Sequence, residues 1–187
     1  MEAKFFLEKL RSTSPTTIDF RHYVSAIVSA LYGSLQHLLY DYAHSFWPNI
    51  DESDYLDPRL FRLLAKSTNN SDALAFIKWY DGLPARINQN DAASIIWNVR
   101  RTETHRANTP FEYRLELFDA VNMSGGTGSN ISGHIEVSVY GPGGGARPTP
   151  YFRENPSRSV EEVIASTISF IESLISEAEV GFPIHYE

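Results

Sequence analysis

The fold is organised around residues 17–46, TIDFRHYVSAIVSALYGSLQHLLYDYAHSF. Apolar side chains recur in this stretch at steps of three and four residues, which places them on one face of an α-helix. The members of this face are Val24, Val28, Leu31, Leu35, Leu38 and Tyr42. Because an α-helix rises about 1.5 Å per residue, this helix would be roughly 40 Å long. We therefore expect it to be the spine of a helical bundle and to end before Pro48.

Two shorter helices are predicted after this spine. Asp57 and Pro58 form an N-cap and first-turn pair, which is typical of the start of a helix. Residues 70–81 carry apolar side chains at helical spacing, and Gly82 and Pro84 close that segment. We expect a loop to follow, before the next helix begins near residue 92.

Two further helices have clear starting signals. Asp91 is a candidate N-cap for a helix that begins at Ala92 and carries apolar residues at positions 95, 96 and 99. Ser159 and Glu162 form a capping box, and a wide apolar face follows over residues 163–175. The second of these helices should complete the bundle.

The intervening sequence predicts a small sheet. Residues 111–117 alternate between apolar and charged side chains, which is typical of a half-buried strand, and residues 135–139 repeat this alternation. These two runs are candidate antiparallel partners, and a third short strand is expected near residues 151–153. Such a small sheet is not stable alone, so its apolar face should pack on the bundle. Residues 1–11 could form either a short strand or a helix.

These elements predict an α+β fold that is mostly helical. We expect a four- or five-helix bundle with a small antiparallel β-sheet inserted before the C-terminal helix. The whole chain, 1–187, should form one domain, with the bundle in 17–106 and 159–179 and the β insertion in 111–153.

Composition restricts the classes of protein to which the chain can belong. It has 42% hydrophobic and 13% aromatic residues, which is typical of a globular domain. No apolar run is long enough for a membrane helix and the start has no apolar signal region, so we expect a cytoplasmic protein that does not contact a membrane. The absence of cysteine excludes disulfides, thiolate zinc sites and cysteine nucleophiles. The net charge of −7 opposes non-specific attraction to nucleic acid, so RNA binding would need a local basic patch.

Two other motifs have functional and structural interpretations. The glycine-rich stretches 124–129 and 141–146 are better explained as loops, because neither has the lysine of a phosphate-binding loop. His37, Asp41 and His44 lie on one side of the long helix and could hold a metal only with help from another helix. We therefore predict neither a cofactor nor a resident metal.

A local basic patch follows the helix that begins near residue 92. Arg100, Arg101 and Arg106 lie within seven residues, together with His105. Histidine can transfer a proton near neutral pH, and arginine offers a forked donor that suits phosphate. These groups are sufficient to cleave a phosphodiester without metal if the nucleophile is a ribose 2′-hydroxyl, which would restrict the substrate to RNA.

The residues Arg100-Arg-Thr-Glu-Thr-His105 resemble the Arg-x4-His signature of the HEPN superfamily. HEPN proteins are small helical bundles, commonly homodimers in which two copies of the motif face one cleft. Many are metal-independent RNases in toxin–antitoxin, phage-defence and RNA-processing systems. The resemblance implies that His105 is the acid and base, that Arg100 binds or orients phosphate, and that an antitoxin partner could exist. Arg101 and Arg106 would gather further RNA phosphates.

Three alternatives stay open at this point. Residues five apart lie about 140° apart around a helix, so Arg101 would share a face with His105 and Arg100 would not. The same stretch could instead be a surface helix end in which Arg101 pairs with Glu103 and His105 stabilises the last carbonyls. The chain as a whole could be a non-enzymatic dimeric helical module that binds a protein partner, which its net acidity favours.

Overall fold

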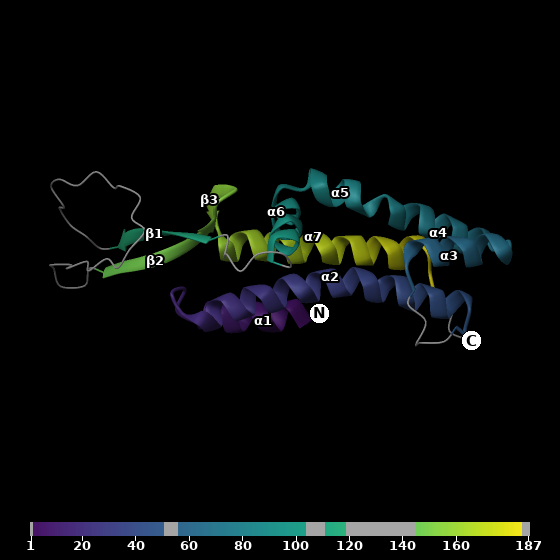
Figure 1. Cartoon of the computed structure of the whole chain (residues 1–187), viewed down its shortest axis with the longest axis horizontal. Helices are drawn as coiled ribbons and strands as arrows, with labels where there is room; N and C mark the ends of the chain where they lie inside the picture. Colours follow the sequence, from purple (N-terminus) through teal and green to yellow (C-terminus); the bar gives the residue numbers. More distant parts are fainter. Residues whose placement is uncertain (1, 51–55, 104–110, 119–144, 185–187) are drawn as a thin grey trace.

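The computed structural model describes residues 2–50, 56–103, 111–118 and 145–184, with side chains in all of these except 101–103, 115–118 and 145–147. The helices are α1 Glu2–Arg11, α2 Ile18–Phe46, α3 Pro58–Ser67, α4 Ser71–Asp81, α5 Leu83–Gln89, α6 Asp91–Glu103 and α7 Val160–Gly181. The strands are β1 Phe111–Phe118, β2 Gly145–Phe152 and β3 Asn155–Ser159. This order confirms the mostly helical α+β fold with a small antiparallel sheet before the last helix (Figure 1).

Helix α2 extends along most of the bundle, beside α7 (Figure 1). The hydroxyl of Thr17 caps its start by accepting a hydrogen bond from the backbone N–H of Phe20. The helix ends at Phe46 because Pro48 disfavours helical backbone in the residue before it. Although α2 has 29 residues and α7 has 22, no helix in the described part of the chain is both long and apolar enough to cross a membrane.

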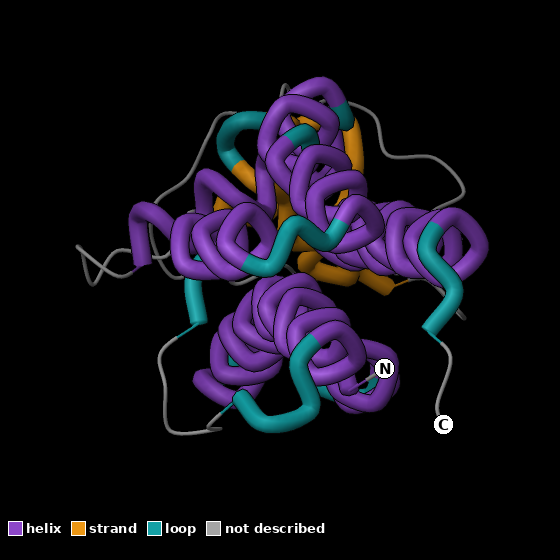
Figure 2. The backbone as a smooth tube through the Cα atoms, turned by 90° about the vertical axis from the view of Figure 1, so that its right-hand side faces the viewer, coloured by secondary structure: helices purple, strands orange, loops and turns teal. Residues whose placement is uncertain are grey.

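The helices form two layers. Viewed along the bundle, α1 and α2 lie together below the remaining helices, and the strands lie at the far end (Figure 2). Ion pairs fasten the layers at their edge, since Lys4 of α1 lies 2.7 Å from Glu172 of α7 and Arg11 lies 2.7 Å from Glu161. All four side chains are partly exposed, so these pairs add little to stability and mainly orient α1 against α7.

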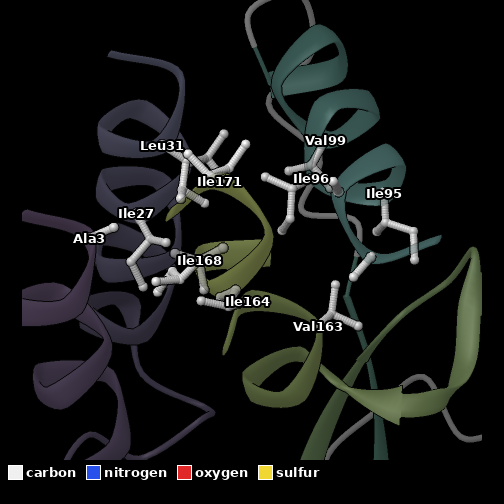
Figure 3. Close-up of a cluster of buried hydrophobic side chains, with 14 of the residues drawn as sticks. Ala3, Ile27, Leu31, Ile95, Ile96, Val99, Val163, Ile164, Ile168 and Ile171 are labelled. Carbon is white, nitrogen blue, oxygen red and sulfur yellow. The ribbon is translucent and has the colours of Figure 1, made fainter. Parts of the chain in front are cut away.

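A first hydrophobic core lies between the two layers. Ile27 and Leu31 of α2 meet Ile164, Ile168 and Ile171 of α7, and α6 packs on the other side of α7 (Figure 3). Because the apolar residues of α7 recur at helical spacing over a wide face, α7 can contact α1, α2 and α6 together. The core therefore has α7 at its centre, between α2 and α6.

A second core joins the far end of α2 to α3 and α4. The rings of Tyr42 and Phe76 are stacked with centroids 4.0 Å apart, and Phe61 is fully buried beside them. The hydroxyl of Tyr42 lies 2.8 Å from the carbonyl oxygen of Ala178 and 2.7 Å from that of Phe182. The single proton of this hydroxyl is shared between the two carbonyls at the C-terminal end of α7, and the Ala178 carbonyl also accepts a hydrogen bond from the N–H of Phe182.

The sheet has the strand order β1-β2-β3, and all of its pairs are antiparallel. Strand β1 pairs with β2 from Phe111↔Phe152 to Phe118↔Gly145. Phe111 and Phe152 are buried, and Phe111 packs edge-on against Phe20 with centroids 6.1 Å apart. The sheet therefore meets the bundle at one end, and β1 and β2 project beyond it rather than laying a whole face on the helices as predicted (Figure 1).

One strand prediction needs correction, and another stays a prediction. The described partner of β1 is β2, and the expected partner strand at 135–139 lies outside the described residues. Residues 151 and 152 end β2, and the third strand is β3. Prolines at positions 148, 150 and 156 obscured these strands, because proline lacks the N–H group that a central strand donates.

The structure decides one open helix prediction and corrects two others. Residues 2–11 form a helix, because Ala3, Leu7 and Leu10 recur at helical spacing and are buried. Pro84 lies in the first turn of α5, where a missing N–H group costs nothing, so most of the expected loop is helical. Asn90, not Asp91, caps α6: its side-chain oxygen accepts a hydrogen bond from the N–H of Ala93 at 3.0 Å.

Candidate functional site

Helix α6 is held against the bundle by one apolar face. Ile95, Ile96 and Val99 are buried, and Figure 3 shows them directed toward α7 and its Val163. The flank of α6 that faces α2 carries larger side chains with polar ends, chiefly Trp97 and Arg100. Because these two residues are three apart, they are neighbours on the helix surface.

The structure describes only part of the predicted basic motif. Arg100 has a described side chain, whereas Arg101 is placed only as backbone of α6. His105 and Arg106 lie outside the described residues. The prediction that His105 pairs with Arg100 or with Arg101 therefore stays a prediction.

Arg100 stacks on an aromatic ring of the neighbouring helix. Its guanidinium carbon lies 3.2 Å from the centroid of the Tyr32 ring, and the Tyr32 ring contacts that of Trp97 at a centroid distance of 5.8 Å. A guanidinium over a ring face is attracted by the ring quadrupole, an effect of about 0.5–1 kcal/mol at an exposed site. Tyr32 is 38% exposed, so this contact lies at the surface and holds Arg100 there.

A pocket of about 250 Å³ adjoins this contact, and we refer to it as the Tyr32–Trp97 pocket. Three aromatic side chains, Tyr32, Tyr80 and Trp97, form part of its walls. Apolar residues make up most of the remainder, namely Leu35, Leu39, Leu56, Pro58, Leu83, Pro84 and Ile87. The lining also includes Gln36, which has an amide, and Asp57, which has a carboxylate. The pocket is thus mostly apolar with a few polar groups, the usual character of a site for a small organic group.

Tyr80 is a fixed and neutral part of the pocket wall. Its hydroxyl donates a hydrogen bond to the backbone oxygen of Leu35 at 3.0 Å. Burial, followed by the nearby Tyr32 hydroxyl, raises the pKa of Tyr80 to about 12. The phenol therefore stays protonated at neutral pH and serves as a wall, not as a base.

A hydrogen-bonded cluster holds this wall in place. Glu177 of α7 accepts a hydrogen bond from Trp79 Nε1 at 2.7 Å and two from Arg86, at 2.8 and 2.5 Å. These donors, with Arg86 making the largest contribution, lower the pKa of Glu177 to about 2. Because Trp79 lies in α4 and Arg86 in α5, one carboxylate fastens both helices to α7, next to Tyr80 and Leu83.

Sequence reasoning missed most of this site. Tyr32, Tyr80 and Trp97 look like ordinary apolar helix residues in the sequence, and only packing brings them to one pocket. One signal was available, because Trp97 and Arg100 are spaced to lie on one helix flank, as in sites that combine stacking with phosphate binding. Their partner Tyr32 is far away in the sequence and gave no such signal.

The other sequence candidates do not add to the site. Within the described residues no three histidine, aspartate or glutamate side chains come together as metal ligands, so His37, Asp41 and His44 do not form the trio considered. The glycine-rich stretch 124–129 lies outside the described residues, as does 141–144 of the second stretch. Gly145 and residue 146 begin β2 instead.

Comparison of the chain with models of protein families, with characterised proteins and with solved structures found no match.

Proposed function

We propose that the chain is a HEPN-like endoribonuclease that cleaves RNA without metal beside the C-terminal part of α6. In this proposal Arg100 binds a backbone phosphate and His105 transfers the protons. Arg101 and Arg106 attract neighbouring phosphates. The chain would act as a homodimer, in which two copies of the motif face one cleft.

The observation that supports the proposal is the position of Arg100 on Tyr32. Stacking occupies one face of the planar guanidinium, while its N–H groups lie in the plane and point sideways. The N–H groups of a guanidinium match two oxygens of a phosphate, which can accept two parallel hydrogen bonds from them. Holding the arginine in advance reduces the side-chain entropy that is lost when phosphate binds. The stacking of Arg100 on Tyr32 therefore favours the binding of an anion by this arginine.

The chemistry requires only a base, an acid and a charge that stabilises the phosphate. A base removes the proton of the ribose 2′-hydroxyl, and the 2′ oxygen attacks phosphorus. The bond from phosphorus to the 5′ oxygen breaks, and an acid gives that oxygen a proton. The products are a 2′,3′-cyclic phosphate and a free 5′-hydroxyl. Arg100 would stabilise the extra negative charge on the phosphate oxygens as the new bond forms.

Cleavage of single-stranded RNA in EDTA tests the proposal. We expect the native chain to release products with 2′,3′-cyclic phosphate ends, and His105→Ala to lose at least a hundredfold in rate, the usual contribution of a general acid or base. His22→Ala is the matched control, because His22 is an exposed histidine near the start of α2. Equal rates for the native chain and His105→Ala, or no cleavage by either, would contradict the nuclease.

A second comparison tests the arginine. Arg100→Gln removes the charge and should slow cleavage, whereas Arg21→Gln removes an exposed charge from the first turns of α2 and should not. Light scattering on the same samples checks the homodimer, since the account predicts twice the 21.1 kDa mass of one chain.

The alternative is a non-enzymatic helical module that binds a protein partner, and the net charge of −7 favours it. Retention on immobilised RNA separates the two functions. A phosphate-binding site predicts retention that falls as salt rises, and a protein-binding module predicts no retention.

A further inference from the structure

We propose that the Tyr32–Trp97 pocket binds one unpaired nucleobase of the RNA, with the adjoining phosphate outside the pocket at Arg100. This inference rests on the proposed function and adds to it how the RNA strand is held. Its first basis is position, because Tyr32 belongs both to the pocket lining and to the contact with Arg100. In an RNA strand a base and its phosphate are also neighbours, because one ribose joins them.

The size of the pocket favours a single ring system. Pockets for drug-sized ligands measure roughly 300–1,000 Å³, and this one measures about 250 Å³. A nucleic-acid duplex has no unpaired base to place in such a cavity. The ligand is therefore a base from a single strand or a loop, the RNA elements that proteins usually read by splaying bases out.

The walls favour a flat and polarisable ligand. Tyr32, Tyr80 and Trp97 supply ring surfaces on which a base can stack, and Leu35 and Leu83 supply the apolar remainder. Stacking tolerates any base, because every base has a π-face. The hydrogen bond from Tyr80 to α2 and its raised pKa keep that ring in place and neutral, so it does not repel RNA.

The polar groups of the pocket favour a base over a phosphate or a purely apolar ring. The Gln36 amide can donate and accept hydrogen bonds. Asp57 uses its Oδ1 atom to accept hydrogen bonds from the backbone N–H groups of Arg59 and Leu60, both at 2.8 Å. Within the described residues Oδ2 has no hydrogen-bond donor, so Oδ2 could accept from a ligand. A carboxylate repels phosphate and accepts from the N–H groups of a base edge.

The opposite charges of Asp57 and Arg100 orient the nucleotide. Asp57 in the lining disfavours an anion in the pocket, while Arg100, which stacks on Tyr32 and does not line the pocket, attracts one. The base therefore enters the pocket and the phosphate stays outside. The scissile bond would then adjoin the bound base, which would give the nuclease a fixed register on its substrate.

Nuclear magnetic resonance of the indole N–H groups tests the pocket directly. The full chain has three tryptophans, so a ¹⁵N spectrum has three indole signals, and Trp97→Phe identifies the one in the pocket. The probes are adenosine, guanosine, cytidine and uridine at millimolar concentration, with ribose 5-phosphate as the ligand that has no base. We expect at least one nucleoside to shift the Trp97 signal and leave that of Trp47 unchanged, and ribose 5-phosphate to shift neither.

Variants give the test its control. Tyr32→Ala should weaken nucleoside binding by about 5- to 150-fold, the range that follows from removing one stacking ring. Tyr113→Ala is the matched control, because Tyr113 is also 38% exposed and does not line the pocket. Gln36→Ala should weaken binding less, and Gln89→Ala, at an exposed glutamine of α5, should not change it.

The outcomes separate this inference from the nuclease. Nucleosides that shift Trp97 in a chain that cleaves no RNA would support the pocket and overturn the nuclease. Cleavage that persists while no nucleoside shifts Trp97, and that Tyr32→Ala leaves unchanged, would overturn the pocket and leave the nuclease. Equal shifts with ribose 5-phosphate would overturn the pocket as a base site.

Discussion

Replacing Glu177 by glutamine tests how the wall of the pocket is held. The change keeps the shape of the side chain and an oxygen that can accept from Trp79, but it removes the charge that Arg86 binds with two hydrogen bonds. If this cluster fastens α4 and α5 to α7, the variant should unfold at a lower urea concentration than the native chain at pH 7.

The magnitude follows from the pKa of Glu177, which falls from its ordinary value of 4.5 to about 2. At about 1.36 kcal/mol per pH unit, the full effect would be about 3 kcal/mol. The side chain is 47% exposed, and water and salt screen such a pair, so we expect about 1 kcal/mol. Because folding lowers this pKa, the stabilisation is present above pH 4.5 and is lost as the pH falls toward 2.

Urea unfolding of the native chain and Glu177→Gln at several pH values between 7 and 3 measures this difference. We expect the difference in unfolding free energy to shrink steadily as the pH falls below about 4.5. Glu179→Gln is the control, since Glu179 is exposed on the same helix. A difference that is absent at pH 7, or that stays constant down to pH 3, would refute the assignment of the stabilisation to this charge.

Three further predictions concern the bundle. Tyr42→Phe should cost about 1–2 kcal/mol in urea unfolding, because it removes a buried hydroxyl whose one proton is shared between the carbonyls of Ala178 and Phe182; an unchanged midpoint would contradict that role. Ile96→Ala should cost about 2–5 kcal/mol and lower the melting temperature by several degrees, since Ile96 is fully buried between α6 and α7; a smaller loss would mean that this interface is loosely packed. Asn90→Ala should cost about 1 kcal/mol in thermal unfolding and more than Asp91→Ala, because Asn90 caps α6; the reverse order would restore the cap to Asp91.

The helices could be predicted where local signals and burial agree. The apolar period of residues 24–42 predicted α2, and the capping box of Ser159 and Glu162 predicted the start of α7, as observed. Asp57 and Asn70 mark the starts of α3 and α4 for the same reason. Each of these signals lies within a short stretch of the chain, so it can be recognised in the sequence without knowledge of the tertiary structure.

The strands were harder to predict because their signals were mixed. The alternation of residues 111–117 predicted β1, but β2 is rich in proline and glycine and does not alternate. Its pairing with β1 depends on partners that are distant in the sequence. Similarly, Pro84 signals a helix start as readily as a helix end, and only the packing of Leu83 and Ile87 decides between them.

The candidate site was predicted in its charge but not in its shape. Arg100 was identified from its spacing to His105, whereas the contact with Tyr32 and the neighbouring pocket arise only when α2 and α6 pack together. The ion-paired cluster at Glu177 is equally non-local, since Glu177 lies 91 residues from Arg86 and 98 residues from Trp79 in the sequence. Sequence spacing shows which groups a helix carries, and tertiary packing decides what they face.

Salt-dependent binding of a single-stranded RNA tests the central claim most directly. The ligand carries 2′-O-methyl groups, which prevent cleavage, and binding is measured over a range of salt concentrations for the native chain, Arg100→Gln and Arg21→Gln. We predict that Arg100→Gln lowers the slope of log affinity against log salt by about 0.7, the contribution of one phosphate contact on a single strand, and that Arg21→Gln does not. A native chain that binds no RNA at low salt, or an Arg100→Gln slope equal to the native one, would contradict the claim that Arg100 on Tyr32 is a phosphate site.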